Sequence, residues 1–162
     1  MESYLIKIKT LQEAKAVCQG VKALGGRVVF TNGCFDLLHP GHTRYLHSSR
    51  ELGDHLIVAV NSDRSVRSIK DPKRPIFEEQ VRAEMVAALH CVDTVVIFDE
   101  ADPLNVIRFL IPDILVKGGD WSEETIIGAD VVKSAGGEVK TIPFVSGFST
   151  TSTIEKIIRR YC

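Results

Sequence analysis

The segment FTNGCFDLLHPGH, residues 30–42, gathers side chains whose types and spacing could do chemistry. Asp36 follows an apolar run, and the segment ends on His39 and His42, which are separated by a proline and Gly41. Imidazole N–H groups can donate to phosphoryl oxygens, and a glycine lets a ligand approach the backbone closely. The histidines also lie where a helix is expected to begin, and the unpaired N–H groups of a helix start attract anions. The segment therefore predicts a phosphate-binding site.

Two other interpretations of these histidines stay open. They could be incidental polar residues at a helix start, or they could bind a metal together with Asp36 and His47. Their spacing matches no H-E-x-x-H site, and Pro40 argues against a regular helix that holds both histidines on one face. We therefore expect no resident metal ion.

A second motif, GFSTT at residues 147–151, opens the last expected helix. Serine and threonine are ordinary helix N-caps, so one of the hydroxyls needs no functional explanation. Three hydroxyl side chains close to a glycine are more than a cap requires, and they suit the outer phosphates of a nucleotide. Together with the first motif, this segment would offer a second helix N-terminus to the same ligand.

Basic and aromatic side chains occur in two further segments. The proline-bounded segment 70–75, KDPKRP, is followed by Arg82 in the next expected helix. Taken singly, Lys73 and Arg74 are best explained as a solvated loop. The segment LVKGGDW, residues 115–121, ends a strand, where its glycines leave room for a flat base. Trp121 could lie beside that base or belong to the core.

The elements that must position these residues follow from alternating patterns. Short runs that are apolar on both faces alternate with helical periodicity, which is typical of a parallel sheet covered by helices. We predict strands at residues 27–31, 55–61, 94–98, 114–119 and 138–144, and helices at residues 42–52, 78–90, 103–111, 125–135 and 149–161. The chain is thus expected to be one α/β domain, residues 1–162, with a Rossmann-like, doubly wound, parallel five-stranded sheet and helices on both faces.

A leading helix over residues 10–25 precedes the core, residues 26–162. Thr10 and Glu13 have capping-box spacing, and two glycines end the pattern. Ligands of doubly wound sheets bind beyond the carboxyl ends of the strands, near the point where strand order reverses. Polar or glycine-rich segments follow four of the strands, so we expect them to converge on one site.

Composition excludes several classes of protein. The formal net charge of −1 gives no reason to expect a nucleic-acid partner. No apolar stretch approaches the length of a membrane span, and the four cysteines form no C-x-x-C pair, which favours a cytoplasmic protein with reduced thiols. The sequence also lacks a G-x-x-x-x-G-K-[ST] loop and a G-x-G-x-x-G turn, so it supports neither a P-loop nucleoside triphosphatase nor an ordinary dinucleotide dehydrogenase.

From about Gly26 to its end the chain resembles the H-x-G-H nucleotidyltransferase superfamily. Within it, the chain is most similar to the D-glycero-β-D-manno-heptose 1-phosphate adenylyltransferase family, which makes ADP-heptose for the lipopolysaccharide core. The resemblance rests on TNGCFDLLHPGH, VAVNSD, KRP, LVKGGDW and GGEV followed by STT, in that order. H-x-G-H alone indicates only the superfamily, whereas LVKGGDW and VNSD favour the narrower family.

The resemblance implies a role for each matching residue. His39, His42 and Lys70 would be catalytic, and Asp36, Asn61 and Lys70 would bind the acceptor substrate. The nucleotide would be bound by Thr31, Asn32, Gly33, Phe35, Gly41, His42, Arg82, Lys117, Gly118, Asp120, Trp121, Ser149, Thr150 and Thr151.

The implied reaction transfers AMP from ATP to heptose 1-phosphate and releases pyrophosphate, with Mg²⁺ accompanying ATP. We also expect a homodimer and a separate heptose kinase upstream. Two alternatives stay open: a cytidylyl- or FAD-forming transferase on the same scaffold, and a nucleotide-binding module without catalysis. The related glycerol-3-phosphate cytidylyltransferases carry Arg-Thr where this chain has Val145-Ser146, which disfavours that branch.

Overall fold

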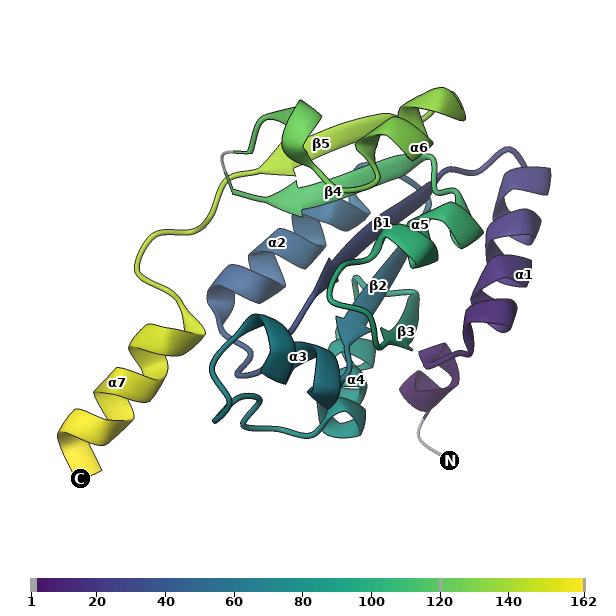
Figure 1. Ribbon diagram of the computed structural model, residues 1–162. Helices are drawn as coiled ribbons and strands as arrows, with labels where there is room; N and C mark the ends of the chain where they lie inside the picture. The colour runs from purple at the N-terminus through teal and green to yellow at the C-terminus, as the bar shows by residue number, and fades with distance from the viewer. Residues whose placement is uncertain (1–2, 120, 162) are drawn as a thin grey trace.

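A parallel sheet of five strands forms the centre of the molecule (Figure 1). The computed structural model describes residues 3–119 and 121–161. The strands are β1 (Val28–Gly33), β2 (His55–Asn61), β3 (Thr94–Phe98), β4 (Ile114–Gly118) and β5 (Glu138–Ile142). Their order across the sheet is β3-β2-β1-β4-β5, and every pairing between them is parallel. The predicted doubly wound sheet is confirmed, and its strand order reverses between β1 and β4.

Helices connect the strands, and most begin and end close to the predicted positions. They are α1 (Leu11–Ala23), α2 (Pro40–Arg50), α3 (Asp63–Ile69), α4 (Glu79–Ala87), α5 (Leu104–Leu110), α6 (Ala129–Ser134) and α7 (Thr150–Tyr161), with 3-10 turns at Ser3–Lys7 and Glu123–Thr125. The capping box of Thr10 and Glu13 is present at the start of α1. The helix predicted over residues 125–135 is shorter, because Gly128 has a left-handed φ of 85° and interrupts it.

The sheet is covered on both faces, as the two-sided apolar strands predict. Phe30 packs with side chains from α1, α5 and α6, whereas the next residue toward the N-terminus, Val29, packs with α2 and α4. Alternate residues of a strand point to opposite faces, so one short strand supplies both cores. This double cover holds the carboxyl ends of β1 and β4 in fixed positions.

The last helix lies apart from this body. In Figure 1, α7 projects away from the sheet at the end of a loop that follows β5, and none of its described residues is buried. Only its first turn approaches the cavity described below. Within the described ranges, no helix is both long enough and apolar enough to cross a membrane.

Candidate active site

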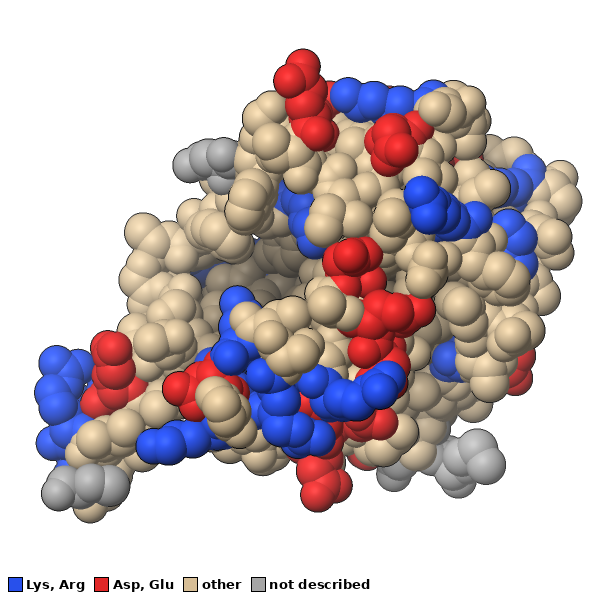
Figure 2. Space-filling model, in the orientation of Figure 1, with Lys and Arg blue, Asp and Glu red and all other residues tan. Residues whose placement is uncertain are grey.

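A cavity of about 730 Å³ lies at the carboxyl edge of the sheet, next to the point where strand order reverses. Figure 2 shows the face of the molecule hollowed here, with basic side chains at the edge of the hollow. Most of the sequence-predicted residues line it: Asn32, Gly33, Phe35, Asp36, His39, Gly41, His42, Asn61, Lys70, Lys117, Gly118, Trp121, Ser149, Thr150 and Thr151. The strand ends therefore converge on one site, as expected.

The two histidines of H-x-G-H are the most unusual feature of the cavity. Their rings stack with centroids 3.8 Å apart, and the ring of Phe35 meets His42 edge-on at 5.4 Å. Both Nδ1 atoms are buried and have no hydrogen-bond partner within the described residues. Burial lowers the pKa of His39, and it lowers the pKa of His42 to about 4, so both rings are neutral near pH 7. Buried nitrogens that lack partners indicate a ligand.

Two glycines make room for these rings. A Cβ on Gly33 would lie 2.9 Å from the Phe35 ring, and one on Gly41 would lie 2.9 Å from the His39 ring. The sequence suggested that Gly41 lets a ligand approach the backbone, but in the structure its missing side chain leaves space for the neighbouring imidazole. The first motif thus specifies a packed aromatic cluster as well as a helix start.

The start of α7 faces the same cavity. Ser149 is its cap, because its Oγ accepts a hydrogen bond from the backbone N–H of Ser152 at 3.0 Å. Thr150 and Thr151 line the cavity, and the Phe148 ring lies 6.3 Å from the ring of His39. Two helix N-termini, those of α2 and α7, are therefore brought to one cavity. That both bind the same ligand stays a prediction of the paired motifs.

The glycines after β4 are covered by an aromatic ring. A Cβ on Gly119 would lie 2.8 Å from Phe144, and one on Gly118 would lie 3.0 Å from the same ring. Trp121 is exposed rather than part of the core, and its indole N–H donates to the carbonyl of Gly118 at 3.1 Å. Phe144, which lies in the loop after β5, was not among the sequence-predicted site residues.

A lysine at the end of β4 is drawn into the cavity wall. Lys117 Nζ donates to Asn32 Oδ1 at 2.8 Å, and burial lowers the pKa of the lysine. The contact joins the ends of β1 and β4 across the point where strand order reverses. It places a cation in the cavity wall, where it would attract an anionic ligand.

Of three further sequence-predicted residues, two do not line the cavity and one lies outside the described residues. Arg82 is fully buried, and its guanidinium donates hydrogen bonds to the backbone carbonyls of Phe77 and Cys34 and to the carboxylate of Asp63. Thr31 is buried with its hydroxyl 2.6 Å from the Tyr45 hydroxyl. The third, Asp120, lies outside the described residues.

A residue that the sequence interpretation assigned to solvent belongs to the cavity wall instead. Arg74 lines the cavity, and only 14% of its side chain is exposed. Its Nε donates to Asp36 Oδ2 at 2.6 Å, although the two residues are 38 positions apart. Nothing local in the sequence could reveal a contact of that separation.

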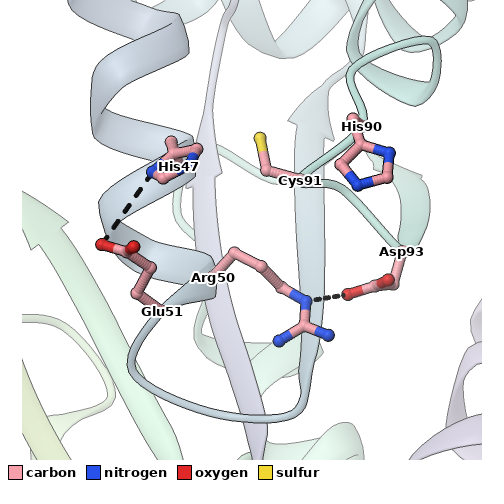
Figure 3. Close-up of a pocket in the computed structure, with 6 residues that line it drawn as sticks. All are labelled: His47, Arg50, Glu51, His90, Cys91 and Asp93. Carbon is pink, nitrogen blue, oxygen red and sulfur yellow. Dashed lines mark ion pairs between the residues drawn. The ribbon is translucent and has the colours of Figure 1, made fainter.

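A second hollow, of about 350 Å³, lies near the amino ends of β2 and β3, and its lining residues are drawn in Figure 3. Several of its charged side chains pair with one another: Arg50 Nε lies 2.7 Å from Asp93 Oδ2, and His47 Nδ1 lies 3.9 Å from Glu51 Oε2. Within residues 3–119 and 121–161, no three histidine, cysteine or acidic side chains are placed to hold a metal ion. The first cavity is therefore the candidate active site.

Comparison with known proteins identifies a family and several similar proteins. Residues 30–155 match the family model described as cytidylyltransferase-like. "Bifunctional protein HldE" of Trichlorobacter lovleyi is 52% identical over 155 residues, which are 96% of this chain and 32% of that protein. "Bifunctional protein HldE" of Geotalea uraniireducens is 54% identical over 151 residues, 93% of this chain and 31% of that protein. This chain spans about a third of the length of these relatives.

Solved structures include similar folds. The lipopolysaccharide core biosynthesis protein from Thermoplasma volcanium GSS1 is 32% identical, with a TM-score of 0.60, and the match covers 75% of this chain and 98% of that one. Pantoate-beta-alanine ligase from Francisella tularensis has a TM-score of 0.62 at 14% identity, covering 94% of this chain and 79% of the ligase. The second likeness concerns the fold alone.

Proposed function

The chain belongs to the cytidylyltransferase-like family, and we propose that it is an adenylyltransferase that transfers AMP from ATP to D-glycero-β-D-manno-heptose 1-phosphate. One observation carries the proposal of nucleotidyl transfer. Two stacked, neutral imidazoles with unpartnered buried nitrogens stand at one helix start, and the hydroxyls of a second helix start face the same cavity. Such an arrangement suits the phosphates of a nucleoside triphosphate.

The choice of acceptor and base rests on the motifs and the relatives. LVKGGDW and VNSD resemble the heptose branch, and the similar proteins named above carry the name HldE over nearly the whole of this chain. The Thermoplasma protein, 32% identical, is described as acting in lipopolysaccharide core biosynthesis. These likenesses support a sugar phosphate of the lipopolysaccharide pathway as the acceptor.

The proposed chemistry is an in-line displacement at the α-phosphorus. An oxygen of the acceptor's phosphate forms a bond to that phosphorus, and the bond from it to the β-phosphate oxygen breaks to release pyrophosphate. A phosphate monoester has a second pKa of about 6, so the nucleophile is largely ionised near neutral pH and needs no base. His39 and His42 would donate to phosphoryl oxygens where charge builds up, and ATP would enter as its magnesium complex.

The surroundings of the enzyme are also proposed. The acceptor is a sugar phosphate, and we propose that a separate heptose kinase acts upstream to supply its phosphate group. The described cysteines are free, which supports a location in the cytoplasm. A homodimer stays a prediction.

Substrate preference tests this assignment. We expect kcat/KM for ATP to exceed that for CTP by at least about tenfold, or about 1.4 kcal/mol, because polar groups built for one base stay unpaired against the other. Heptose 1-phosphate should likewise be preferred over glycerol 3-phosphate. A pyrophosphate-release assay that crosses four nucleoside triphosphates with a panel of sugar and polyol phosphates measures both. Equal or better use of CTP would contradict adenylyl transfer, and nucleotide binding without pyrophosphate release with any pair would favour a non-catalytic module.

Lys70 is expected to act on the acceptor side. It follows α3 and lines the cavity, as does Asn61 at the end of β2. Lys70→Ala should raise KM for the sugar phosphate about tenfold and change kcat less, since a cation on the acceptor's phosphate binds the ground and transition states alike. Steady-state kinetics with each substrate varied measures the split. An equal rise in KM for ATP would place Lys70 on the nucleotide instead.

A further inference from the structure

One buried carboxylate, in the loop that follows β1, holds the loop between α3 and α4. Asp36, 1% exposed, accepts hydrogen bonds from the backbone N–H groups of Ile76 at 2.9 Å and Phe77 at 3.0 Å. It also accepts the bond from Arg74 Nε at 2.6 Å. The carboxylate is thus surrounded by donors from the loop, and a phosphate beside it would be repelled. These contacts do not support the sequence-based role of Asp36 as a direct ligand of the acceptor.

The same contacts leave most of the Arg74 guanidinium available. Arginine has five N–H donors, of which Nε–H is used by Asp36. The two terminal nitrogens of Arg74 have no partner within the described residues, and the side chain lines the cavity together with Lys70. A guanidinium that is held through Nε presents its terminal N–H groups in a fixed orientation. That geometry matches two oxygens of a phosphate.

The position of Arg74 in the cavity favours the acceptor over the nucleotide. The two helix starts and the glycines after β4 take the phosphates and the base in the proposed function. Arg74 and Lys70 come from the loop that follows α3, and α3 itself follows β2, on the other side of β1 from β4. The cations of this loop therefore face the part of the cavity that the nucleotide leaves open.

We propose that Arg74 binds the phosphate of the acceptor and that Asp36 is the positioning residue that orients it. This inference rests on the proposed function and adds a residue to it that the sequence assigned to solvent. The carboxylate fixes the loop backbone and the guanidinium at once, so the acceptor's phosphate meets a rigid fork. The net charge of the pair is zero before the acceptor arrives, which limits the cost of burying the arginine.

The first test is the substrate dependence of Arg74→Ala. KM for heptose 1-phosphate should rise about tenfold or more, and KM for ATP should change less than about twofold, because the lost bonds belong to one substrate. Lys73→Ala is the matched control, since Lys73 is an exposed cation in the same loop outside the cavity lining, and it should leave both constants unchanged. An unchanged KM for the acceptor would overturn the proposal, and so would an effect on ATP alone.

The positioning role is tested by double-mutant kinetics. Asp36→Asn should raise KM for the acceptor in the otherwise unchanged protein, but in the Arg74→Ala background it should add less than about twofold. Full additivity would mean that Asp36 acts on the acceptor by itself and would overturn its role. If Asp36→Asn does not fold, Arg74→Lys tests the positioning role instead. An ammonium keeps the charge, but it cannot bond Asp36 and also present two parallel N–H donors to a phosphate. A wild-type KM in Arg74→Lys would then overturn the positioning.

Direct binding separates this inference from the proposed function. Inorganic phosphate is a probe that needs no transferase activity, and calorimetry should show weaker phosphate binding in Arg74→Ala than in wild type and Lys73→Ala. If no substrate pair yields pyrophosphate but this difference is present, the proposed function fails and the anion site stands. If phosphate binding is equal in all three proteins and KM for the acceptor is unchanged, the site itself is refuted.

Discussion

His42→Ala is expected to lower kcat by about a hundredfold or more, which is the usual loss when one preorganised donor to a developing charge is removed. The imidazole of His42 is stacked on His39, its Nδ1 is buried without a partner in the described part of the chain, and burial lowers its pKa to about 4. A hydrogen bond from a desolvated ring of this kind becomes stronger when negative charge builds up on the acceptor beside it. Binding of ATP should change much less than turnover, because the bond strengthens as the reaction proceeds.

The measurement is pyrophosphate release at saturating ATP and acceptor, with nucleotide affinity determined separately by calorimetry. His47→Ala is the control, because His47 lies on the same helix with most of its side chain exposed. His39→Ala should act in the same direction as His42→Ala. Wild-type turnover by His42→Ala would remove the basis for the catalytic role of the H-x-G-H motif.

The fold could be predicted well because its signals are local. Five short apolar runs, the capping box of Thr10 and Glu13, and the alternation of strands with helices each depend on a few neighbouring residues. The α3 helix was missed because it has only seven residues, too few for a clear period. The convergence of strand ends on one cavity followed from topology, since parallel strands place their carboxyl ends at a common edge.

The parts of the site that the sequence did not indicate depend on distant contacts. Asp36 and Arg74 are 38 positions apart, and the ring of Phe144 covers glycines from another strand. A sequence shows that a charge is present but not whether its partner is a ligand or the protein's own backbone. Arg74 appeared to be a solvated cation because the loop that carries it is polar, whereas the carboxylate that draws it inward belongs to another segment.

Arg82 is a different case, because its fully buried guanidinium bonds only to protein atoms that the structure describes. Among these atoms, the carbonyl oxygen of Phe77 belongs to a residue whose N–H donates to Asp36, and the carbonyl oxygen of Cys34 belongs to the residue directly after β1. The arginine therefore joins the loop between α3 and α4 to the segment that follows β1, as Asp36 also does. Its contribution should be to the stability of the cavity wall, with no direct bond to the nucleotide.

Arg82→Met should accordingly lower the free energy of unfolding by about 3 kcal/mol, the lower end of the range for removing one partner of a buried ion pair. Methionine keeps an unbranched chain in the space but leaves the carboxylate of Asp63 and two carbonyls without their donor. The carboxylate is 21% exposed, so water can compensate part of the loss, and for that reason the lower end applies.

Denaturant unfolding of the ligand-free protein measures the change. Arg67→Met, at an exposed position of α3, is the control and should change stability by less than about 0.5 kcal/mol. If Arg82→Met keeps wild-type stability but loses ATP affinity, the structural role is refuted and Arg82 contacts the nucleotide.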